Sequence, residues 1–89
     1  MKHCYLEVTY RSGRAVGAYY YFPRRDGAKS ARAERVNGGL LVDFSSAGRA
    51  IGIEISSPSR LDLAKLNAVL ARLGLQPARH EDLAPLSAA

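Results

Sequence analysis

The chain of 89 residues contains one cysteine, two histidines and no tryptophan. A single cysteine excludes the intrachain disulfide framework that stabilises many small secreted domains. No apolar run approaches the roughly 18 residues that a membrane-spanning helix needs, and the first residues lack the apolar core of a signal peptide. We therefore expect a cytoplasmic protein that does not enter a membrane.

Catalytic and metal-binding motifs are also missing. The soft metal ligands, apart from one methionine, are His3, Cys4 and His80, and they do not follow a zinc spacing. A free amino terminus followed by His3 can bind Cu(II) or Ni(II) in a square plane, but any chain with histidine at position three has this property. Cys4 lies beside His3, which could lower its pKa, yet a cysteine in a strand is more often a small buried hydrophobe. We predict no cofactor, no metal site and no enzymatic activity.

The strongest structural signal lies between Gly39 and Ile55, where two alternating apolar runs flank a turn rich in serine and glycine. This pattern predicts a β-hairpin with Gly48 at positive φ. A loop of residues 45–48 would pair Phe44 with Arg49, Val42 with Ile51 and Leu40 with Ile53. The apolar face would contain Leu40, Val42, Phe44, Ile51, Ile53 and Ile55. The other face would contain Leu41, Asp43, Ala50, Gly52 and Glu54, as in a sheet with one solvated face.

Three segments of this hairpin carry a resemblance to a known family: LVDF at 41–44, the turn ending in Gly48-Arg49, and IGIEI at 51–55. They are similar to the signature of the domain of unknown function 2283 family, a group of small prokaryotic proteins. The similarity covers roughly residues 29–60. Family members have an acidic first turn, whereas the corresponding segment here, residues 10–15, is basic. The resemblance implies the strands of this region and supplies no activity.

The remaining chain predicts three more strands and one helix. Strands are expected over about 3–10 and 15–22. Residues 28–36 are compatible with a helix or a solvent-facing strand, and the family resemblance and the turn at 37–39 favour a strand that pairs directly with the hairpin. A helix is expected over about 60–73, with Ser59 as N-cap and Gly74 just after its end. Its apolar stripe contains Leu63, Leu66, Val69, Leu70 and Leu73, and its outward residues are Lys65, Asn67 and Arg72.

These elements predict an α+β fold, an antiparallel β-meander of about five strands with one C-terminal helix packed on one face. Residues 1–75 would form a single domain, and residues 76–89 a short C-terminal tail.

Positive charge is concentrated in the first part of the chain. Residues 1–35 carry eight basic and three acidic residues, whereas residues 36–89 carry five of each. An excess of this kind favours an anionic partner, either nucleic acid or an acidic protein surface.

Four consecutive aromatic residues, 19–22, place rings on both faces of the expected second strand. One face can enter the core, and the other needs cover from the C-terminal segment, a partner subunit or a ligand. Single-strand nucleic-acid binding combines two features, aromatic rings on which bases stack and cations close to them. The alternative is that two rings fill the core, the others pack in a homodimer, and the arginines form a solvated rim. The candidate surface contains Arg11, Arg14, Tyr19, Tyr21, Arg24 and Arg25.

Asp43 and Glu54 both lie on the polar face of the hairpin, and paired carboxylates can act as acid and base or hold a metal. In the expected register they are about 13 Å apart, which is too far for one proton relay. We therefore interpret them as two solvated residues that keep this face polar.

Taken together, the sequence favours a non-enzymatic protein-interaction module that self-associates as a homo-oligomer and binds another protein. By analogy with other small prokaryotic domains, this module would be antitoxin-like. The alternative is a nucleic-acid-binding protein that uses the basic, tyrosine-rich first part of the chain.

Overall fold

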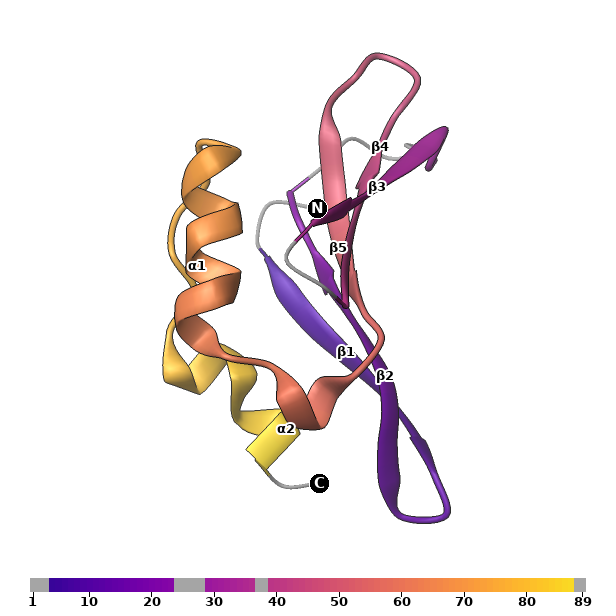
Figure 1. Ribbon diagram of the computed structural model, residues 1–89, viewed down its shortest axis with the longest axis vertical. Coiled ribbons are helices and arrows are strands. Elements are labelled where there is room, and N and C mark those ends of the chain that lie inside the picture. Colours follow the sequence, from indigo (N-terminus) through magenta and orange to yellow (C-terminus); the bar gives the residue numbers. More distant parts are fainter. Residues whose placement is uncertain (1–3, 24–28, 37–38, 88–89) are drawn as a thin grey trace.

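The computed structural model describes residues 4–23, 29–36 and 39–87. Its strands form one antiparallel sheet, and a helix lies against one face of that sheet (Figure 1). The strands are β1 (Tyr5–Arg11), β2 (Arg14–Tyr21), β3 (Arg32–Val36), β4 (Leu40–Phe44) and β5 (Ala50–Ile55). The helical segments are η1 (Pro58–Arg60), α1 (Leu63–Arg72), η2 (His80–Leu83) and α2 (Ala84–Ser87). The predicted α+β class is confirmed.

The strand order is β1-β2-β5-β4-β3, so the sheet is not a simple meander along the whole chain. β3 pairs with β4 as expected, but β2 pairs with β5. The central position suits β5 because Ile51, Ile53 and Ile55 are each at most 1% exposed. A strand this apolar is best buried when it has a neighbouring strand on each side and a helix over its face.

A β-bulge changes the register of the central hairpin. The observed pairs are Leu40 with Ile55, Leu41 with Glu54, Val42 with Ile53, Asp43 with Gly52 and Phe44 with Ala50. The expected pairs, Phe44 with Arg49, Val42 with Ile51 and Leu40 with Ile53, are wrong. The first reason is that the loop includes Arg49, whose carbonyl oxygen accepts a hydrogen bond from the amide of Ser45 at 2.8 Å. The second is that Ile51 is an extra residue of β5 with no partner on β4, which makes a β-bulge. Gly48 has φ 82°, as predicted, and Ala50 packs against the core instead of joining the polar face.

The core lies between the sheet and α1. Tyr20 of β2 and Phe22, which directly follows this strand, enter the core, so these are the internal rings among the four consecutive aromatic residues. The predicted helix stripe is confirmed, because Leu66, Val69 and Leu70 are buried and its two end leucines are half-buried. Most of the apolar surface of this small chain is therefore gathered on one side of one sheet.

Helix α1 begins later than its sequence pattern suggests. Residues 58–60 form the short helix η1, and Leu61 is extended, so Ser59 is not the N-cap. The N-cap is Asp62, whose Oδ1 accepts a hydrogen bond from the amide of Ala64 at 2.8 Å. A carboxylate cap satisfies an unpaired amide of the first turn and interacts favourably with the helix dipole.

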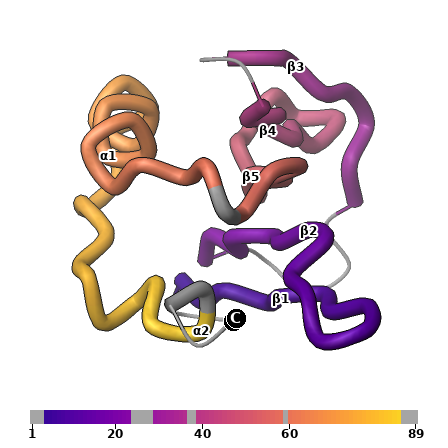
Figure 2. Tube along the Cα trace, turned by 60° about the horizontal axis from the view of Figure 1, so that its bottom comes forward, coloured from indigo at the N-terminus to yellow at the C-terminus, as the bar shows by residue number. Residues whose placement is uncertain are grey.

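Residues 75–87 run back along α1 toward β1 (Figure 2). Asn67 does not face outward as expected. Its Nδ2 donates to the carbonyl of Ala78 at 3.1 Å, and its Oδ1 accepts from the amide of Ala78 at 2.7 Å. Ala78 is 4% exposed, and farther along the carbonyl of Pro85 accepts a hydrogen bond from the hydroxyl of Tyr10. These contacts join the C-terminal segment to the core and to β1.

Candidate functional site: the open face of the sheet

The face of the sheet opposite α1 is not covered by any described element (Figure 1). On this face, two rows of cross-strand neighbours run perpendicular to the strands. The first row contains Tyr5, Tyr21, Gly52 and Asp43, and the second contains Glu7, Tyr19, Glu54 and Leu41. We call Tyr5, Tyr19, Tyr21, Glu7, Asp43 and Glu54 the open-face cluster.

The tyrosines of the open-face cluster pack against one another. Tyr5 and Tyr21 are stacked, with ring centroids 4.5 Å apart and an interplanar angle of 12°. Tyr19 and Tyr21 are tilted by 53°, with centroids 4.6 Å apart. Tyr5 remains 46% exposed. Aromatic pairs of this geometry are more favourable than their buried area alone would give. The three rings therefore form a continuous aromatic surface fixed on β1 and β2.

Carboxylates hold the tyrosine hydroxyls. Tyr19 donates to Oδ2 of Asp43 at 2.6 Å, and Tyr21 donates to Oε1 of Glu7 at 3.4 Å. The first bond spans β5, because Tyr19 lies on β2 and Asp43 on β4. It is possible because the residue between them is Gly52, where an added Cβ would lie 2.6 Å from Cζ of Tyr19. The ring of Tyr19 therefore occupies the space that the Cβ of any residue other than glycine would need at position 52.

Asp43 and Glu54 lie closer together than the expected register implied. Asp43 is opposite Gly52 and Glu54 is opposite Leu41, so the two acids are diagonal neighbours. Diagonal neighbours are about 7–8 Å apart, and the separation of about 13 Å is wrong because the bulge shifts β5. Asp43 is half-buried under the Tyr19 hydroxyl, whereas Glu54 is exposed.

A hollow of about 270 Å³ lies beside Tyr19 on the open face. Glu7 and Glu54 flank it, since both are direct cross-strand neighbours of Tyr19. Gly17 contributes no side chain there, and nothing lies within 4 Å of the Cβ that it lacks. The hollow therefore combines an aromatic ring with two carboxylates, a set of groups that suits a cation.

Two of the four candidate arginines lie in the part of the chain that the structure describes, and the strand register places them away from Tyr19 and Tyr21. Arg11 and Arg14 are exposed and pair with each other at the turn between β1 and β2. Arg24 and Arg25 lie outside the described residues. Arg35 is the basic residue in line with Leu41, at the β3 margin of the open face. Among the described residues, the carboxylates of Asp43 and Glu7 accept hydrogen bonds from Tyr19 and Tyr21, and sequence reasoning had not combined these acids with the rings.

Sequence reasoning assigned Tyr5, Glu7 and Gly17 to no site, and it placed Gly52 on the polar face of the hairpin without relating it to Tyr19. The alternation of β1 places Tyr5 and Glu7 on the same face. Their relation to Gly52 follows only from the pairing of β2 with β5, which no local pattern reveals.

Cys4 shows no sign of an activated thiol. Burial raises its pKa, an effect that a hydrogen bond with Tyr20 partly offsets. Cys4 is half-buried and packs against the core, in agreement with the small-hydrophobe interpretation. The sequence left a lowered Cys4 pKa open as the alternative, and burial acts in the opposite direction.

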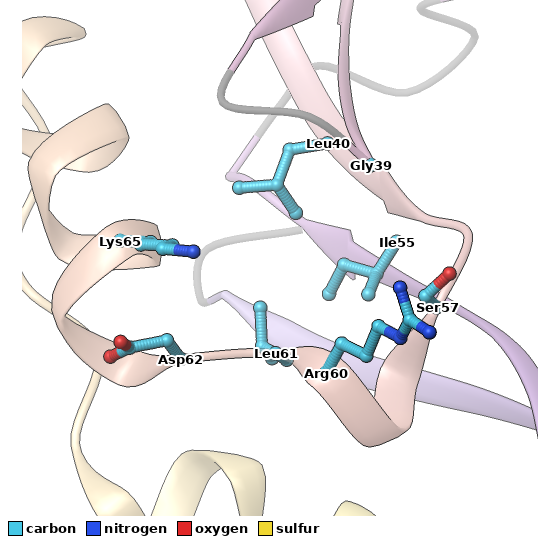
Figure 3. A pocket seen from close by; sticks show the side chains of 8 residues that line it. All are labelled: Gly39, Leu40, Ile55, Ser57, Arg60, Leu61, Asp62 and Lys65. Carbon is cyan, nitrogen blue, oxygen red and sulfur yellow. The ribbon is translucent and has the colours of Figure 1, made fainter.

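A second hollow, of about 310 Å³, lies on the helix side of the sheet, where the start of β4 and the end of β5 face the start of α1. Its residues are Gly39, Leu40, Ile55, Ser57, Arg60, Leu61, Asp62 and Lys65 (Figure 3). The nitrogen of Lys65 points into this hollow from α1, and the guanidinium of Arg60 lies on the opposite side near Ser57.

Within the described part of the chain, no three residues of the types histidine, cysteine, aspartate and glutamate are grouped closely enough to hold a metal ion. None of the described helices has the length and apolar character required to cross a bilayer. Comparisons with protein-family models, with curated proteins and with solved structures give no match. The resemblance of residues 29–60 to the domain of unknown function 2283 family stays a prediction.

Proposed function

We propose that this protein is a non-enzymatic interaction module that binds another protein through the open-face cluster. The observation that carries the proposal is the mutual packing of Tyr5, Tyr19 and Tyr21 on a sheet face that no described element covers. Tyrosine is enriched in protein interfaces because its ring buries apolar area while its hydroxyl stays hydrated. Monomers seldom leave a contiguous patch of this kind in water.

The charges of the cluster specify the chemistry of the partner. Glu7 and Glu54 stand on either side of Tyr19, so a lysine or arginine side chain in the hollow would meet a ring and two carboxylates. Contacts of a cation with a ring and with carboxylates reinforce each other when water is displaced. The partner that fits best is therefore a protein segment with an exposed arginine or lysine.

Two other occupants fit less well. A symmetric pairing of two open faces would bring the carboxylates of both copies together, and like charges opposed across an interface are unfavourable. Nucleic acid would place phosphates near Glu7, Asp43 and Glu54, although phosphate binding requires positive charge. Neutralisation of a toxin-like protein would be one form of the interaction that we propose.

The proposal is tested by capture from native lysate on three immobilised proteins. These are the wild type, the variant Glu7→Gln/Glu54→Gln, and the control Glu34→Gln/Glu81→Gln, which removes two exposed carboxylates elsewhere. We expect a stoichiometric protein partner on the wild type and the control, and its loss from the open-face variant. Equal recovery on all three proteins, or recovery of nucleic acid alone, would contradict the proposal.

A further inference from the structure

We propose that the hollow at the start of α1 binds a small organic anion with an apolar body, such as a short-chain carboxylate. This site is separate from the open-face cluster because Leu40 belongs to the core side of the sheet, and Leu61 and Lys65 lie at the start of α1. Its volume of about 310 Å³ lies at the lower end of the range for small-molecule sites, roughly 300–1,000 Å³.

The bottom of the hollow is apolar. Leu40 and Ile55 are buried core residues of β4 and β5, and the half-buried Leu61 lies between them and the start of the helix (Figure 3). A ligand with an aliphatic chain would gain from removing its surface from water here. A fully hydrated inorganic ion would gain nothing from these residues.

Two cations, Arg60 and Lys65, and one acid, Asp62, border the hollow. Arg60 and Lys65 form no ion pair with any residue in the described ranges. The carboxylate of Asp62 points away from the hollow and accepts the amide of Ala64, because it caps α1. An anionic group between Arg60 and Lys65 would therefore meet positive charge from both sides, with the hydroxyl of Ser57 as a further donor.

The arrangement requires both parts of the ligand. Charge alone would draw any anion to exposed cations, and such contacts are weak in water. Apolar area alone would favour a neutral molecule. The combination predicts that hexanoate binds better than acetate, which has no chain to bury, and better than 1-hexanol, which has no charge.

The experiment is a two-dimensional NMR titration of isotope-labelled full-length protein with sodium hexanoate, sodium acetate and 1-hexanol. We expect hexanoate to shift amide signals of residues 39, 40, 55, 57, 61 and 65 at lower concentration than either comparison compound. Arg60→Gln and Lys65→Gln should each weaken hexanoate binding roughly two- to fivefold, the effect of one partly exposed charge. Arg72→Gln removes an exposed cation at the other end of the same helix and should leave hexanoate binding unchanged.

The comparison of the three compounds on the unmodified protein keeps the test valid if a variant fails to fold. Equal binding of acetate and hexanoate would overturn the role of the apolar bottom. Equal binding of 1-hexanol and hexanoate would overturn the role of the cations. Shifts confined to other residues, or no shifts, would overturn the site.

Discussion

The hydroxyl of Tyr19 lies 2.6 Å from Oδ2 of Asp43, although β5 separates their two strands. The ring passes over Gly52, the only residue type that leaves room for it. This bond joins β2 to β4 across the central strand and orients one ring of the open-face cluster. The glycine is therefore required for the shape of this surface and not for an unusual backbone conformation.

Gly52→Ala should displace Tyr19 and break its bond with Asp43. We expect a net loss of about 1 kcal/mol in the free energy of unfolding, because the lost hydrogen bond outweighs the gain from replacing glycine within a strand. Gly17→Ala is the matched control, since nothing lies within 4 Å of the added methyl group. Urea denaturation should show the control to be neutral or slightly stabilised, and an equal loss in both variants would contradict this view of Gly52.

Leu66→Ala should be among the most damaging substitutions in the chain. Leu66 is 0% exposed at the centre of the helix stripe, and truncating such a residue costs about 2–5 kcal/mol. Lys65→Ala, one position earlier and exposed, should change stability by less than about 0.5 kcal/mol. Urea unfolding of both variants provides the measurement. A small effect of Leu66→Ala would mean that α1 does not pack on the sheet as described.

Asn67→Ala should release the C-terminal segment from α1. Both hydrogen bonds between Asn67 and Ala78 would be lost, and we expect a cost of about 1–3 kcal/mol. Asn67→Asp is a useful comparison because it keeps an acceptor for the amide of Ala78 but removes the donor to its carbonyl. Amide hydrogen exchange should accelerate over residues 75–87 most in the alanine variant. Unchanged exchange in that segment would show that other contacts hold it.

Stability should decrease in alkaline solution because of Cys4 and Tyr20. Burial raises the pKa of the Tyr20 hydroxyl, with a further contribution from Cys4, and burial also raises the pKa of the Cys4 thiol. In the unfolded state, cysteine and tyrosine lose their protons as the pH rises past about 8.5 and 10, respectively. The folded state keeps these two protons to higher pH. Under these conditions the free energy of unfolding falls as pH rises.

Tyr20→Phe tests this linkage, since it keeps the ring in the core and removes one titrating group. Between about pH 9 and 11 its free energy of unfolding should fall less steeply than that of the wild type. Tyr5→Phe, which removes a hydroxyl from an exposed ring, is the control. Parallel pH profiles for the wild type and Tyr20→Phe would refute the assignment.

Local patterns explain how much of this fold was predictable. The helix stripe around Leu66 and the alternation of β4 and β5 are short-range signals, so the elements and the apolar face of the sheet were correct. The expected register was wrong by one residue because loops of four and five residues are both compatible with the same serine- and glycine-rich turn, and by one more because the bulge at Ile51 adds a residue to β5. The helix start was missed because Ser59 and Asp62 are both good N-caps.

The candidate site was predictable only in part. Tyr19, Tyr21, Asp43 and Glu54 were each singled out from the sequence, but as members of two unrelated surfaces. The structure places them in one cluster because β2 pairs with β5, a contact between distant parts of the chain. Strand register places the carboxylates of Glu7 and Asp43 beside these rings, a combination that charge composition did not suggest.

The central claim is that the open-face cluster binds a cationic protein segment. The most direct measurement is an NMR titration of the labelled protein with a short arginine-containing peptide, its citrulline counterpart and a single-stranded oligonucleotide, at low and physiological salt. We predict shifts at residues 7, 17, 19 and 54 with the arginine peptide, much weaker shifts with citrulline, and loss of the arginine effect in Glu7→Gln/Glu54→Gln. Oligonucleotide binding at these residues, or equal binding of arginine and citrulline peptides, would contradict the account.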